Sequence, residues 1–165
     1  MSMRQTSAAA VAVVSLLSLL GACRSATEPA VGPVGAEVLA APTRAVVAGQ
    51  SVHLDTYLWR DFMPVSPPDG KPLIAVARIL ADSGATVGAA VTADSLWVIA
   101  DGRAWAARAT EEQPRSATGA GFEVVARDGP KWGPGVRVDV VVRLHDGTGG
   151  TVYVRAADQL IRRTD

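Results

Sequence analysis

The fold follows from one stretch of sequence, VRVDVVVRLH-DGTGG-TVYVRAA, which runs from Val136 to Ala157. Apolar and polar residues alternate on both sides of the glycine-rich turn, and a period of two is typical of a strand with one buried face. If Leu144 lies opposite Val152, the aliphatic side chains of both strands share one face of a hairpin. That face consists of Val138, Val140, Val142, Leu144, Val152, Val154 and Ala156. The other face, which we expect to be polar, carries Arg137, Asp139, Val141, Arg143, His145, Tyr153 and Arg155.

A second hairpin is expected within Ser95–Ala109, where Asp101-Gly102 separates two strand-like runs. Two-residue Asp-Gly loops favour the type I′ turn that suits the twist of paired strands. If these two residues form the loop, Val98 faces Trp105 and Ile99 faces Ala104. Large side chains then oppose small ones, as close packing requires.

Other segments also show strand patterns and are separated by residues typical of turns. They are Glu37–Ala41, Ser51–Phe62, Leu73–Ala81, Thr86–Val91, Phe122–Arg127 and Gln159–Thr164. About eight or nine short strands with regular turn signals and no amphipathic helix predict an all-β domain. We expect a Greek-key β-sandwich, with a small β-barrel as the alternative.

The final hairpin resembles the closing hairpin of bacterial immunoglobulin-like and fibronectin III-like domains. The resemblance covers residues 136–165 and rests on alternating valines around Asp-Gly-Thr-Gly-Gly. It implies an immunoglobulin-like sandwich. The Cys…Trp…Cys spacing of antibody domains is absent, because the chain has a single cysteine.

The N-terminal residues have the pattern of an export signal. An apolar run, Ala8–Leu20, follows Arg4 and leads into Gly21, Ala22 and Cys23. A positive start, an apolar core of about 7–15 residues and small residues at the end are typical of a signal peptide. The run is shorter than the roughly 20 apolar residues that a membrane-spanning helix needs. A small pair followed by cysteine resembles the lipobox of bacterial lipoproteins.

This resemblance implies cleavage before Cys23 and a lipid on its sulfur. It predicts a signal peptide (1–22), a lipidated cysteine with a flexible tether (23–35) and a β-domain (36–165). The protein would then be anchored in the cell envelope, facing the periplasm or the exterior. Arg24 stands where some inner-membrane lipoproteins have aspartate, which favours the outer membrane. The alternative is an ordinary cleaved signal in which Cys23 has no role.

Composition excludes several classes of function. The chain has 16 basic and 16 acidic residues, and loss of Arg4 with the signal leaves one excess negative charge. No basic stripe indicates binding to nucleic acid. A single cysteine, Cys23, allows no disulfide within the chain.

No local motif indicates catalysis, a metal or a cofactor, and we expect none of the three. His53 and His145 lie on faces expected to be solvated, and no third ligand stands at a useful spacing. No serine lies in a nucleophile elbow. The sequence Asp146-Gly147-Thr148 lacks the further carboxylates of a calcium loop.

The remaining candidate is a surface for a partner. Phe62–Pro72 contains four prolines, which exclude helix and stiffen the segment. Strand alternation turns the preceding Tyr57 and Trp59 away from the aliphatic face, and exposed aromatics beside a stiff loop are typical of interfaces. The candidate partner-binding residues are Tyr57, Trp59, Phe62, Met63 and, in the loop 128–135, Trp132. The alternative is that Trp59, Phe62 and Met63 fill one end of the core.

Three functions are compatible with these observations. The one we favour is a non-catalytic binding or structural role for a lipid-anchored protein, with the membrane and an envelope protein as partners. The second is a carrier that holds a small ligand in a pocket between the sheets or in a barrel mouth. The third is an envelope hydrolase whose site is assembled in space without a local motif.

Overall fold

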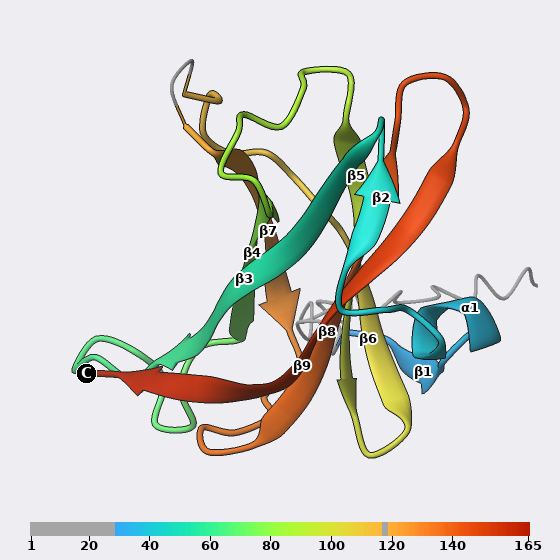
Figure 1. Cartoon of the computed structure of the whole chain (residues 1–165). Helices are drawn as coiled ribbons and strands as arrows, with labels where there is room; N and C mark the ends of the chain where they lie inside the picture. Colours follow the sequence, from blue (N-terminus) through green and yellow to red (C-terminus); the bar gives the residue numbers. More distant parts are fainter. Residues whose placement is uncertain (1–28, 117–118) are drawn as a thin grey trace, which may run out of the picture.

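A computed structural model describes residues 29–116 and 119–165 of the chain (Figure 1). This part contains nine β-strands and one short helix. In chain order they are β1 (Val31–Pro33), α1 (Ala36–Leu39), β2 (Ala45–Val47), β3 (Gln50–Asp61), β4 (Leu73–Ala81), β5 (Thr92–Ala100), β6 (Arg103–Arg108), β7 (Gly121–Gly129), β8 (Arg137–His145) and β9 (Thr151–Thr164). The prediction of an all-β domain is confirmed.

The strands form a single mixed sheet that curls through 226° into a half-barrel. Its strand order is β1-β6-β5-β8-β9-β3-β4-β7, and β2 pairs with the start of β3. All neighbouring strands are antiparallel except β3 and β9, which pair in parallel from Leu58–Ile161 to Asp61–Thr164. The expected two-sheet immunoglobulin-like sandwich is therefore wrong.

Strand β9 is the reason for this difference. A sandwich needs two separate sheets that pack face to face. The first part of β9, Thr151–Leu160, pairs with β8, and its last part, Ile161–Thr164, pairs with β3. One strand therefore joins what would otherwise be two sheets. Within the part of β9 that pairs with β8, the register shifts between Ala156 and Gln159, where Asp158 has a φ of 59°.

Both predicted hairpins are confirmed in register. Leu144 lies opposite Val152, and Val98 lies opposite Trp105. Asp101 and Gly102 have φ values of 48° and 74°, as a type I′ turn requires. Leu73–Ala81 is a strand with neighbours on both sides, also as predicted.

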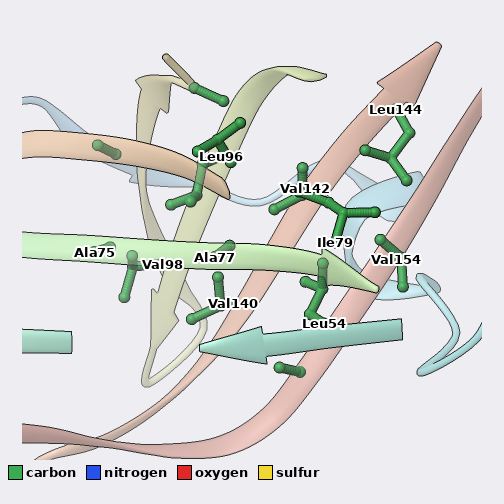
Figure 2. Close-up of a cluster of buried hydrophobic side chains, with 14 of the residues drawn as sticks. Leu54, Ala75, Ala77, Ile79, Leu96, Val98, Val140, Val142, Leu144 and Val154 are labelled. Atoms are coloured by element: carbon green, nitrogen blue, oxygen red, sulfur yellow. The ribbon is translucent and has the colours of Figure 1, made fainter. Parts of the chain in front are cut away.

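The concave face of the sheet carries the core. Figure 2 shows aliphatic side chains from five strands pointing toward one another: Leu54, Ala75, Ala77, Ile79, Leu96, Val98, Val140, Val142, Leu144 and Val154. Across the open side of the half-barrel, Thr110 and Val125 exchange two backbone hydrogen bonds of 3.1 and 2.8 Å. Gly129 lies directly against the buried ring of Trp105. These contacts bring the β7 edge and the chain after β6 together over the core.

Four local predictions are corrected. Glu37–Ala41 is not a strand, because residues with good helix propensity form α1 here and Val38 packs against Val141. Val141, expected on a polar face, is therefore fully buried on the convex side.

Thr86–Val91 is a loop with two buried valines, since the neighbouring Thr92–Ala100 takes the strand position beside β8. Val31–Pro33, within the expected tether, pairs with β6 as β1.

Candidate functional site

The predicted partner-binding residues lie on two different surfaces of the half-barrel. Tyr57 and Trp59 lie on the convex face of β3, with their ring centroids 5.1 Å apart. Tyr57 is 44% exposed and Trp59 is half-buried. The alternation of β3 causes this, because Leu54 and Leu58 on the other face are buried in the core. We call Tyr57 and Trp59 the aromatic pair.

A shallow hollow of mixed charge surrounds the aromatic pair. Arg162 of β9 lies 5.7 Å from the centroid of the Tyr57 ring, within the range of a cation–π contact. On the other side, Arg78 of β4 is shared by Asp55 at 3.7 Å and Glu123 at 3.5 Å. The hollow therefore offers two aromatic faces flanked by both signs of charge. Such a surface suits an amphipathic partner better than a purely apolar or purely ionic one.

The apolar residues of the proline-rich loop 62–72 have two different roles. Phe62 is half-buried beneath the loop, with Gly70 against its ring and the Arg163 guanidinium 4.1 Å from the ring centroid. Met63 and Val65 instead point outward, with 48% and 85% of their surface exposed. Phe62 therefore supports the loop, whereas Met63 and Val65 are free to contact a partner.

A buried arginine that the sequence reading did not single out holds this loop. Arg60 is only 3% exposed, and its guanidinium donates to four backbone carbonyl groups. The acceptors are Asp69 and Lys71 of the proline-rich loop and Lys131 and Gly133 of the loop between β7 and β8. Burial lowers the pKa of Arg60, and Asp69 acts in the opposite direction. Strand alternation was the available signal, because Arg60 shares the inward face of Leu54 and Leu58.

Trp132 lies beside the proline-rich loop and not in the hollow of the aromatic pair. Its half-buried ring packs against the core and lines hollows shared with Arg103 and Val136. A salt bridge of 2.5 Å between Lys131 Nζ and Asp69 Oδ2 adds to the link between the two loops. The hydrogen bond with Lys131 holds the pKa of Asp69 below its usual value. The two loops therefore lie together at one end of the domain.

Each histidine is bound to a carboxylate. His53 Nδ1 lies 2.6 Å from Asp82 Oδ1, and Ser51 Oγ donates to Asp82 Oδ2 at 2.6 Å. The serine hydrogen bond, followed by that of His53, lowers the pKa of Asp82. Because the serine donates to the carboxylate and not to the imidazole, it lacks the base partner that a serine nucleophile needs.

The second histidine belongs to an arginine–carboxylate cluster on the convex face. Arg143 binds both oxygens of Asp94, at 2.8 and 2.7 Å, and His145 Nε2 lies 3.0 Å from the same carboxylate. The hydrogen bonds from Arg143 are the main cause of the lowered pKa of Asp94. Across the residues that the structure describes, no group of three or more histidine, cysteine or acidic side chains could hold a metal ion.

Cys23, the predicted lipidation site, lies outside the described residues. Among residues 29–116 and 119–165, no helix is long and apolar enough to cross a membrane. By fold and surface, the described part is a half-barrel β-domain with an exposed aromatic pair. Comparison with family models, with curated proteins and with solved structures found no match.

Proposed function

We propose that this protein is a lipid-anchored extracytoplasmic half-barrel with a non-catalytic binding role. The observation that carries the binding role is the aromatic pair on the convex face, in which Tyr57 is exposed beside Arg162 and Trp59 is half-buried. Large aromatic side chains and arginine contribute most of the binding energy at many protein interfaces. The proposed partner is a protein of the cell envelope.

The rigidity of β3 supports this proposal. From Val52 to Trp59 the strand pairs with β4, and from Leu58 to Asp61 it pairs with β9. Trp59 lies where β3 is paired on both sides, and Tyr57 pairs with Val76 of β4, so little backbone freedom is lost when a partner binds. The surface is thus preorganised for binding.

The two alternative functions have less support. A carrier needs a pocket, but the concave face is filled by aliphatic side chains such as Ile79, Val98 and Val140, all fully buried. A hydrolase needs an activated nucleophile, whereas Ser51 donates to Asp82 and leaves His53 bound to the same carboxylate. The binding role therefore remains the proposal.

Lipid anchoring is tested by expressing the full-length chain and its Cys23→Ala variant in a bacterial host and fractionating the cells. We expect the wild-type chain in the membrane fraction and the variant in the soluble fraction. Mass spectrometry of the mature N-terminus identifies the lipid. Equal membrane retention of a processed Cys23→Ala protein would contradict anchoring.

The binding role is tested by photo-crosslinking in intact cells. A photoreactive phenylalanine analogue replaces Tyr57 in one variant and Ala85, an exposed residue of the β4–β5 loop, in a matched control. We expect a discrete crosslinked protein from position 57 only. Its yield should fall when Arg162→Ala is added, because Arg162 flanks the Tyr57 ring. Absence of a product from position 57, or the same products from both positions, would contradict the proposal.

A further inference from the structure

The chain enters the domain beside Trp132, at the middle of β6, where Val31 pairs with Trp105. Pro29 and Val31 line one hollow together with Arg103, Lys131 and Trp132. The proline-rich loop, the β7–β8 loop that carries Trp132 and the Asp101-Gly102 turn lie at one end of the half-barrel, in the lower part of the view in Figure 1. We call it the Trp132 end.

The covalent link between Pro29, beside Trp132, and the proposed anchor is short. Five residues, 24–28, separate Cys23 from Pro29. Even fully extended, this connection spans only about 20 Å. Trp132, which lines a hollow together with Pro29, is therefore within reach of a membrane that holds Cys23. This step rests on the lipid anchoring proposed above.

Exposed apolar side chains gather at the Trp132 end. Val65 and Met63 point outward from the proline-rich loop, and Val136, also exposed, lines a hollow with Trp132. Arg60 fixes the two loops to each other through four carbonyl groups. The apolar side chains are therefore presented on a preordered surface and not on separate mobile loops.

The polar groups of this end also suit a phospholipid surface. Arg103 lies in the hollow beside Pro29, where its guanidinium can meet a lipid phosphate. Tryptophan is favoured at the depth of lipid headgroups because its ring is amphipathic. Exposed aliphatic side chains beside it can insert into the boundary between headgroups and acyl chains.

We propose that the Trp132 end lies against the phospholipid surface of the membrane that holds Cys23. In this orientation Met63 and Val65 enter the headgroup layer, and Trp132 lies at its boundary with water. The aromatic pair, on the convex face of β3, remains accessible to a soluble or membrane-bound partner. The predicted site residues then serve two ligands: Met63 and Trp132 contact lipid, and Tyr57 and Trp59 contact protein.

The test uses the full-length lipidated protein in vesicles of phosphatidylethanolamine and phosphatidylglycerol. Val65→Cys and Ala85→Cys provide matched exposed attachment points at opposite ends, and each is labelled with an environment-sensitive fluorophore. Because Cys23 is lipidated, the introduced thiol is the only free one. Both proteins should float with the vesicles. We expect a blue shift and strong quenching by headgroup nitroxide lipids for the label at 65, and neither effect for the label at 85.

The other outcomes separate the two proposals. If the proteins float but the label at 65 stays as water-exposed as the label at 85, the membrane contact is wrong while the anchor stands. If the label at 65 is shielded in native envelope membranes but not in pure lipid vesicles, a protein covers this end and the lipid assignment is wrong. If the wild-type chain does not float, the anchor is wrong and the membrane contact fails with it.

Discussion

Arg60 Nη1 donates a 2.7 Å hydrogen bond to the carbonyl oxygen of Gly133, a residue 73 positions further along the chain. The same guanidinium binds Lys71 and Asp69 in the loop that follows its own strand. A buried cation bound by carbonyl groups of two loops fixes their relative position. The fixed position of the proline-rich loop relative to the β7–β8 loop, which carries Trp132, underlies the proposed membrane contact.

Replacing Arg60 should therefore destabilise the domain. Arg60→Met keeps similar apolar volume but removes every donor, and we expect a loss of about 2–3 kcal/mol in the free energy of unfolding. Urea unfolding followed by circular dichroism measures this change. Arg78→Met is the control, since Arg78 is exposed and surface ion pairs contribute at most about 1 kcal/mol. Equal losses in the two variants would contradict the role of Arg60.

The two neighbouring apolar residues of the proline-rich loop should behave differently. Phe62→Ala removes a ring packed against Gly70 and Arg163 and should cost about 2–3 kcal/mol of stability. Met63→Ala changes an exposed side chain and should alter stability by less than about 0.5 kcal/mol. Thermal or urea unfolding of both variants checks this. A large loss from Met63→Ala would show that Met63 is part of the core and unavailable for lipid.

The Asp101-Gly102 turn should resist substitution at its glycine. No heavy atom lies within 4 Å of a Cβ added to Gly102, so any cost of Gly102→Val comes from its φ of 74°. We expect a loss of about 1 kcal/mol or more in urea unfolding. Gly88→Val is the control, because that position also has open space but no left-handed φ. An unchanged urea midpoint for Gly102→Val would count against the turn.

The Asp94 cluster should make stability depend on acid pH. Arg143 holds the pKa of Asp94 below its unfolded value, so the native state binds the proton more weakly than the unfolded state. The stabilisation from the carboxylate is present above the unfolded pKa of about 4 and is lost as pH falls toward the folded value. The Asp94→Asn variant should therefore lose less stability than the wild type as the pH falls. The urea midpoint of each protein is measured from neutral pH to pH values below 4. If the midpoints of wild type and variant fall by the same amount, Asp94 does not cause the pH dependence.

Helix α1 offers a matched pair of neighbours. Val38 is 2% exposed and packs on Val141, whereas Leu39 is 50% exposed. Val38→Ala should lower the free energy of unfolding by about 1–2 kcal/mol, because two buried methyl groups are lost. Leu39→Ala should cost less than about 0.5 kcal/mol. If both variants match the wild type, α1 does not contribute to the stability of the fold in solution.

The aromatic pair shows how far sequence reasoning about the site could go. Alternation along β3 is a local property, and it placed Tyr57 and Trp59 outward from the sequence alone. Alternation could not show that Trp132 lines other hollows than this pair and belongs to a loop linked to the proline-rich loop. That arrangement depends on the curl of the sheet and on the bonds that Arg60 makes to both loops.

The sequence by itself determined the two hairpins, including the pairs Leu144–Val152 and Val98–Trp105. Their contacts lie between residues joined by a tight turn, so alternation and turn chemistry are enough to set the register. Only the tertiary structure decided that Ile161 pairs with Leu58, 103 residues away and in parallel. A strand end with no turn to its partner can bond to any free edge, and the available edge is known only once the other strands have packed. The parallel pairing of β9 with β3 therefore gives a half-barrel, whereas the sequence predicted a sandwich.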